Sequence, residues 1–178
     1  CDVPVSGIDY YPTLLELAGV PVPPEQVVDG KSFVSLLQGR ADEELAGRDL
    51  FWHYPHYGNQ GGDPSAIIRR GNWKLIHYFE DGHDELYDLA ADPGEQTDRL
   101  AEHRDKASAL RDRLDAWLKE VGARLPVPDP EHDAAKETAR LHQLEHELMP
   151  RLERDHARYL DPDWQPNADW WGSQVVKD

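Results

Sequence analysis

The feature that most constrains the fold is a run of short extended segments between residues 49 and 89, separated by tight-turn signals. Arg70-Gly71-Asn72 and Asp81-Gly82 are such signals, because glycine adopts positive φ without steric cost. Aromatic, β-branched and apolar residues mark four strands: Asp49–Tyr54, Ser65–Arg70, Trp73–Phe79 and Glu85–Leu89. Strands joined at this spacing predict a small four-stranded antiparallel meander.

A long amphipathic segment follows the meander. Apolar residues recur at spacings of three and four between about Asp98 and Val121, while charged residues occupy the other face. Thr97 or Asp98 could cap the start of this helix, and Gly122 could end it. A meander buries one face against a neighbouring layer, so we expect the helix to cover that face. The predicted fold class is therefore α+β.

Residues 1–48 contain shorter helical patterns. Asp9 could cap a helix whose apolar stripe, including Tyr10, Leu14 and Leu17, repeats at three and four. A proline-rich connector (20–28), a short helix at Phe33–Leu37 and a charged surface loop (40–48) are predicted to follow. We expect the apolar face of the first helix to lack its partner, because the sequence begins as if a longer chain had been cut.

The last fifty residues form a third part. Residues 125–130 predict a rigid spacer, and a helix with a weaker stripe is predicted from Glu131 to about Met149, where Pro150 would end or kink it. The tail after residue 160 carries three of the six tryptophans. Such a tail would expose a large apolar area, so we expect it to wrap back on the body or on a missing part.

Charge and composition exclude several classes of partner. The net charge of −16 would repel the phosphates of nucleic acid and of anionic membranes. No apolar run approaches the roughly 20 residues that a membrane-spanning helix needs. The single cysteine, Cys1, excludes an internal disulfide and a thiolate zinc site.

Metal and catalytic motifs are weak. His142 and His146 match the H-x-x-E-H pattern of some zinc peptidases, but a third ligand is not evident and the segment is charged all round. We interpret it as a solvated helix face. No nucleophile stands with a base in a recognisable pattern, so the sequence predicts no catalytic residues and no metal site in this chain.

Two groups could bind an anion or a sugar. His53 and His56 precede a flexible glycine-rich loop that runs to Asp63, and loops at strand ends are where binding sites concentrate. A structural role for both histidines is equally compatible with the sequence. Arg69, Arg70 and Lys74 form a basic cluster, which we interpret as hairpin-surface charge. Its expected partners across the turn are acidic: Glu80, Asp81 and Asp84.

Several segments resemble a known family. IDYYPTLLELAGV, DLFWHYPHY, GNWKLIHY and ELYDLAADPGEQ are similar, in order and spacing, to the C-terminal third of type I sulfatases. These are the formylglycine-dependent sulfate ester hydrolases of the alkaline phosphatase superfamily. The resemblance covers about residues 1–130, and it does not extend to residues 131–178.

The resemblance implies a two-part enzyme of which this chain is one part. Residues 1–48 would be the helical end of the large α/β domain, residues 49–124 the C-terminal subdomain, and residues 125–178 a linker, helix and extension. Formylglycine and calcium are implied for the complete enzyme, in a preceding domain. Cys1 does not fit the C/S-x-P-x-R motif from which formylglycine is made, since Pro4 stands one residue too far and no arginine follows.

The resemblance also implies roles and partners. His53 and His56 match the position from which a loop would reach the substrate mouth, which makes them candidate substrate contacts. The complete enzyme would take a sulfated small molecule or glycan, and this chain alone would be inactive. Periplasmic or secreted localisation follows by analogy, and exposed apolar surface could support a homo-oligomer.

Two alternatives remain open from the sequence. The chain could be a free-standing module that grips glycans with Trp52, Tyr54 and Tyr57, which would require exposed rings. It could also be part of a related phosphate or phosphonate ester hydrolase, a difference that the catalytic part would decide.

Overall fold

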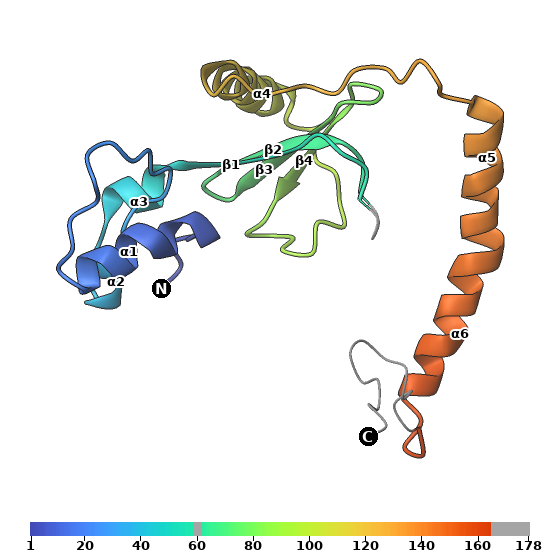
Figure 1. Ribbon diagram of the computed structural model, residues 1–178, viewed down its shortest axis with the longest axis horizontal. Helices are drawn as coiled ribbons and strands as arrows, with labels where there is room; N and C mark the ends of the chain where they lie inside the picture. Colours follow the sequence, from blue (N-terminus) through green and yellow to red (C-terminus); the bar gives the residue numbers. More distant parts are fainter. Residues whose placement is uncertain (59–61, 165–178) are drawn as a thin grey trace, which may run out of the picture. The chain divides into compact units, whose positions relative to one another are not determined.

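The computed structural model describes residues 1–58 and 62–164, and the chain forms two compact units, residues 1–127 and 128–178. The first unit contains the sheet, and the second contains one long helical segment (Figure 1). None of the helices in these described ranges is long and apolar enough to cross a membrane.

Four antiparallel strands form the sheet, in the order in which they occur in the sequence. They are β1 (Asp49–Tyr54), β2 (Ser65–Arg70), β3 (Trp73–Tyr78) and β4 (Asp84–Asp88). Gly71 and Gly82 both adopt positive φ at the turns where the sequence predicts them. The predicted four-stranded meander is confirmed; the third strand ends one residue earlier than predicted, and the fourth begins and ends one residue earlier.

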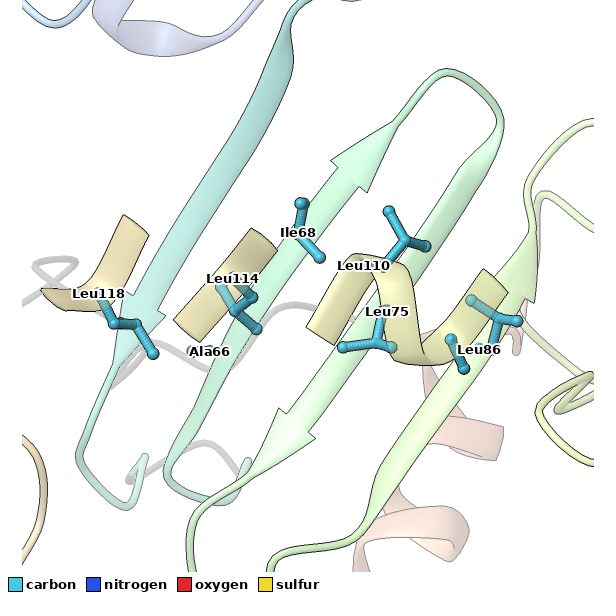
Figure 2. Close-up of a cluster of buried hydrophobic side chains, with 8 residues drawn as sticks. Ala66, Ile68, Leu75, Leu86, Leu110, Leu114 and Leu118 are labelled. Carbon is cyan, nitrogen blue, oxygen red and sulfur yellow. The ribbon is translucent and has the colours of Figure 1, made fainter. Parts of the chain in front are cut away.

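One long helix, α4 (Arg104–Glu120), covers one face of this sheet (Figures 1 and 2). Its buried residues pack on the inward side chains of β2, β3 and β4. The core consists of Ala66, Ile68, Leu75 and Leu86 from the sheet and Ala107, Leu110, Leu114 and Leu118 from the helix. Full burial of each leucine or isoleucine contributes about 1.5–3 kcal/mol. The predicted α+β fold, a sheet under one amphipathic helix, is confirmed.

The start of α4 differs from the sequence-based prediction. The helix begins at Arg104, and its N-cap is His103 rather than Thr97 or Asp98. The Asp98 carboxylate instead accepts hydrogen bonds from the backbone N–H groups of Leu86 (3.0 Å) and Leu100 (2.9 Å). Asp98 therefore ties the connecting turn to β4, which delays the helix. Its end is as predicted, since Gly122 has positive φ and the chain turns there.

The first 48 residues form short helices. These are a 3₁₀ turn (Gly7–Asp9), α1 (Tyr10–Leu17), α2 (Val34–Leu37) and α3 (Glu43–Gly47). Tyr10, Leu14 and Leu17 of α1 are exposed. The prediction that residues 40–48 form a surface loop is wrong. Asp42 caps α3 by accepting from the Leu45 N–H, and the Leu45 side chain is buried.

A buried carboxylate joins these short helices to β1. Asp9 is fully buried and accepts hydrogen bonds from the Ser6 N–H (2.6 Å) and the Lys31 N–H (3.0 Å). Both of its oxygens also face the Arg48 guanidinium, with Nη1 at 2.7 Å from Oδ1. Burial by itself raises the pKa of Asp9, but the hydrogen bonds from Arg48, Ser6 and Lys31 outweigh it and lower the pKa to about 2.

The second unit contains α5 (Ala134–Gln143), a π turn (Leu144–Leu148) and α6 (Met149–Tyr159), which follow one another without a break (Figure 1). Asp133 caps the start. Of the two predicted outcomes, an end or a kink at Pro150, the end is wrong, because α6 continues to Tyr159; the kink stays a prediction. The π turn precedes Pro150 and accommodates the missing N–H and the bulk of the ring. Most of the tryptophan-rich tail lies outside the described residues, so its predicted wrapping back stays a prediction.

Candidate functional site

The candidate site lies at the end of β1, an edge strand that pairs only with β2. Successive side chains of a strand point to opposite faces, so His53 and Tyr54 diverge. Phe51 shares the α4 side with His53 and stacks on Trp117, with ring centroids 4.6 Å apart. His53 therefore points toward the α4 side of the sheet, and Trp52 and Tyr54 point toward the opposite side.

His53 is held by the backbone. Its Nε2 lies 2.9 Å from the Arg124 carbonyl oxygen, and its ring meets Phe79 edge-on at 5.5 Å. A carbonyl can only accept, so Nε2 carries the hydrogen of this bond. Nδ1 is buried and has no hydrogen-bond partner within the described part of the chain. This geometry fixes the segment after α4 to the end of β1.

His56 lies in a different environment. Its side chain is exposed, and its ring meets Tyr54 edge-on at 5.5 Å. Tyr54 belongs to the face that α4 does not cover, where Trp52 is 42% and Tyr54 52% exposed. His56 is thus accessible to solvent, whereas His53 makes structural contacts, so the two imidazoles have different neighbours. Residues 59–61 of the adjoining loop lie outside the described ranges.

The sheet face opposite α4 combines apolar and polar groups. The hydroxyls of Tyr78 and Tyr87 each donate to Glu85 at 3.0 Å, and Lys74 reaches Glu95 at 2.6 Å. Burial, and then the hydrogen bond to Glu85, raise the pKa of Tyr78 to about 12, and the same causes raise the pKa of Tyr87. Both tyrosines are therefore hydrogen-bond donors to Glu85 throughout the physiological pH range.

The basic cluster is paired, but with partners other than those expected. Arg70 forms a bidentate ion pair with Asp49 at 2.6 and 2.7 Å, because the register places the two opposite each other on β2 and β1. Lys74 pairs with Glu95, and Arg69 Nε donates to the Gly71 carbonyl. The prediction of Glu80, Asp81 and Asp84 as partners is therefore wrong. Asp81 pairs with His83 and Asp84 with Arg111.

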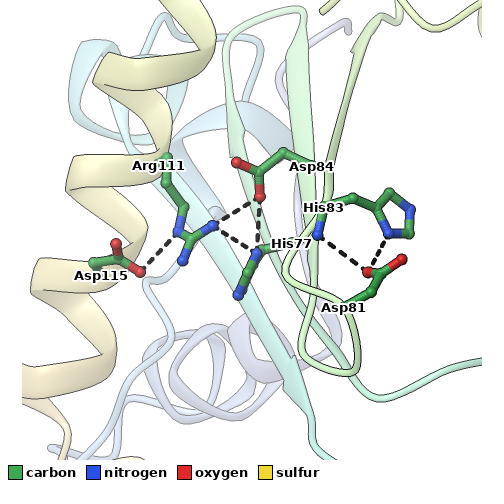
Figure 3. A network of polar contacts seen from close by, with 6 residues as sticks. All are labelled: His77, Asp81, His83, Asp84, Arg111 and Asp115. Carbon is green, nitrogen blue, oxygen red and sulfur yellow. Dashed lines mark hydrogen bonds and ion pairs between the residues drawn. The ribbon is translucent and has the colours of Figure 1, made fainter.

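Sequence reasoning missed a polar cluster under α4 (Figure 3). His77 of β3 is buried, and its Nδ1 lies 2.8 Å from Asp84 Oδ1 and 2.6 Å from Arg111 Nη1. Arg111 also reaches Asp84 at 2.9 Å and Asp115 at 2.9 Å. The cluster ties α4 to β3 and β4. The sequence did hold a signal for the burial of His77, because His77 follows Leu75 by two residues in a strand and so lies on the same buried face.

Metal-binding groups are not assembled in the described part of the chain, where no three or more His, Cys, Asp or Glu side chains could hold an ion. The rings of His142 and His146 touch edge-on at 4.2 Å on an exposed helix, and Cys1 is exposed. These residues do not fit the calcium and formylglycine chemistry that the resemblance implies for a complete sulfatase.

Comparison with known proteins agrees with the fold. A "Sulfatase" of Formosa agariphila is 36% identical over 152 residues, which cover 74% of this chain and 28% of that protein. A delta 4,5-hexuronate-2-O-sulfatase of Bacteroides thetaiotaomicron is 33% identical over 107 residues, covering 54% of this chain and 21% of that protein. The chain thus spans between a fifth and a third of the length of these relatives.

A solved structure shares the architecture. It is a complex with its substrate, D-glucosamine-2-N,6-O-disulfate, and it matches with a TM-score of 0.55 and 28% identity over 70% of this chain and 25% of that one. The family described as N-sulphoglucosamine sulphohydrolase, C-terminal, matches residues 2–123. That range contains the short helices, the sheet and α4. The chain therefore belongs to the C-terminal sulfatase domain family.

Proposed function

We propose that this chain is the C-terminal part of an enzyme that hydrolyses sulfate esters of sugars. The observation that carries the proposal is the family match over residues 2–123, which includes both the short helices and the covered sheet. Relatives named for sulfated sugars support the substrate class. Calcium and formylglycine would belong to the preceding catalytic domain, and this chain would supply packing surface and a loop at the substrate mouth.

The sheet face opposite α4 is the surface that we assign to the catalytic domain. Ile76 and Tyr87 on this face are buried, yet Trp52 and Tyr54 on the edge strand stay exposed. Large aromatic side chains that are exposed together on one face are typical of an interaction surface. In this arrangement residues 1–48 end the large domain, residues 49–124 form the subdomain, and residues 125–178 are an extension.

His53 and His56 would then have separate roles. His56, exposed beside the loop that leads to Asp63, would donate a hydrogen bond to a sulfate or hydroxyl oxygen of the substrate. His53, bonded to the Arg124 carbonyl, would position the end of β1 from which that loop departs. Both act on binding and positioning, and neither breaks a bond.

Kinetics of a longer polypeptide that includes the coding sequence before Cys1 test this proposal. His56→Ala should raise KM for a 6-O-sulfated glucosamine several-fold while leaving kcat within twofold. His83→Ala is the matched control, because His83 is also exposed but pairs with Asp81 on another turn. A longer polypeptide that hydrolyses phosphonate but not sulfate esters would refute the substrate class. An unchanged KM in His56→Ala would refute the assigned contact.

A glycan-binding module is the second candidate, because Trp52 and Tyr54 do not lie beneath α4. An exposed indole face can stack on a sugar ring. Titration of the chain with a sulfated disaccharide, followed by tryptophan fluorescence, separates the two. Micromolar binding that Trp52→Ala abolishes would favour the module. The sulfatase proposal expects no saturable binding by this chain in the absence of the catalytic domain.

A further inference from the structure

The helical segment of the second unit carries an apolar stripe. Residues 134–159 run through α5, the π turn and α6 for 26 residues, or about 39 Å at 1.5 Å per residue. No side chain of this segment is buried. Its large apolar side chains are Leu141, Leu144, Leu148, Met149, Leu152 and Tyr159. A stripe of this size on an isolated helix needs a partner to be stable in water.

The π turn brings Met149 onto the side of the helix that Leu144 occupies. A π turn holds one residue more than a regular turn, so it rotates the following side chains back by about 100°. Without it, Met149 would lie about 140° around the helix from Leu144, and with it the two lie about 40° apart. Leu152 and Tyr159 then stay within a band about 100° wide that also contains Leu141 and Leu144. Glu137 and His156 fall within the same band, toward its two ends.

The stripe is complementary to itself when reversed. When a second copy of the segment is laid alongside in reverse about a centre between His146 and Glu147, four pairs of suitable residues meet. The pairs are Leu141 with Leu152, Leu144 with Met149, Ala134 with Tyr159, and Glu137 with His156. Leu148 is the exception, because its counterpart is Glu145. A parallel arrangement would instead place Glu137 against Glu137, and like charges in contact are destabilising.

We propose that α5 and α6 of one copy pair antiparallel with the same segment of a second copy. A twofold contact of this kind uses one surface patch twice, so every favourable pair is made twice. In an antiparallel pair, the partially positive N-terminus of each helix also lies beside the partially negative C-terminus of the other, which is favourable. Glu137 already forms an ion pair with Arg140 of its own helix at 2.6 Å, and His156 of the other copy would lie beside this ion pair at both ends. This association lies outside the region matched by the family, so it does not depend on the proposed enzymatic function.

Sedimentation equilibrium of the complete chain is the first test. We expect a monomer–dimer equilibrium with a dissociation constant in the micromolar range. Leu144→Asp should weaken it at least tenfold, with circular dichroism used to check that helix content is retained. Leu17→Asp is the matched control, because Leu17 is an exposed leucine on α1. A chain that stays monomeric up to several hundred micromolar, or a dimer that Leu144→Asp leaves intact, would overturn the proposal.

Disulfide cross-linking tests the direction without relying on a disruptive variant. In a Cys1→Ser background, Ala134→Cys and Tyr159→Cys proteins are oxidised separately and as a mixture. The antiparallel pair predicts a cross-linked product mainly in the mixture. Strong self-cross-linking of Ala134→Cys alone would show a parallel pair, and no product in any sample would show that the stripes do not meet. Either result contradicts the proposal.

Discussion

Replacing Asp9 by asparagine should remove a large share of the stability of the first 48 residues. The Asp9 carboxylate is buried, accepts two backbone hydrogen bonds and faces Arg48 with both oxygens. Asparagine retains one oxygen acceptor and turns an amide toward the guanidinium. The substitution therefore leaves Arg48 with its charge and without a counter-charge, in a site that is nearly closed to water.

The pKa of Asp9 sets the size of the effect. Folding lowers it from 3.8 to about 2. At about 1.4 kcal/mol per pH unit, the folded state favours the ionised carboxylate by about 2.5 kcal/mol. Removing one member of a buried ion pair costs roughly 3–5 kcal/mol in other proteins. We therefore expect Asp9→Asn to lower the free energy of unfolding at pH 7 by about 3 kcal/mol.

The sign of the pH dependence follows from the same shift. Because the folded pKa is depressed, the ionised Asp9 stabilises the fold fully above about pH 5. That contribution declines as pH falls through 3.8, the unfolded value, and is gone near pH 2. The difference in unfolding free energy between the original chain and Asp9→Asn should therefore shrink over this interval.

Urea unfolding between pH 7 and pH 3, followed by tryptophan fluorescence, measures both quantities. Asp81→Asn is the matched control, since Asp81 is exposed and its pKa is lowered chiefly by the hydrogen bond from the His83 side chain. It should leave the midpoint at pH 7 almost unchanged. A loss below 1 kcal/mol for Asp9→Asn at pH 7 would refute the reasoning. So would a difference that stays constant from pH 6 to pH 3.

Two further substitutions test the packing. Leu114→Ala should destabilise the chain by roughly 2–5 kcal/mol, because Leu114 is fully buried between α4 and the sheet, whereas Leu37→Ala, at a side chain 61% exposed, should cost under 1 kcal/mol; equal losses in urea unfolding would contradict the core described above. Gly30→Ala should destabilise by about 1–3 kcal/mol or more, because its Cβ would lie 2.0 Å from the Ile8 carbonyl oxygen, while Gly7→Ala meets nothing within 4 Å. Thermal melts of Gly30→Ala and Gly7→Ala decide this comparison. An unchanged melting temperature for Gly30→Ala would show that the contact with the Ile8 backbone is not tight.

Local patterns determined how much of the fold could be predicted. The bounds of β1 and β2 follow from strand alternation and from glycines at the turns, which are properties of a few neighbouring residues. The packing of α4 on the sheet follows from the apolar stripe along one side of this helix. The start of α4 could not be predicted, because Asp98 bonds to Leu86 across the unit rather than capping the helix. The sequence did not predict α3 either, because this short helix depends on the burial of Leu45, which is a tertiary contact.

The candidate site was predictable in part. The spacing of His53 and Tyr54 already implies that they face opposite sides of a strand. The contact of His53 with Arg124, 71 positions later in the chain, has no local signal. The pairing of Asp9 with Arg48, across 39 positions, is equally non-local. Long-range polar contacts of this kind depend on the folded arrangement, so a single sequence does not reveal them.

We propose that this chain carries the sulfatase C-terminal fold and that the groups that break the ester bond belong to the catalytic domain. Hydrolysis of an aryl sulfate and of a 6-O-sulfated glucosamine by the purified chain tests it most directly. We predict no turnover above the buffer background with either ester, before and after adding calcium. Turnover that follows the chain through successive purification steps, and disappears in Cys1→Ala, would contradict the claim.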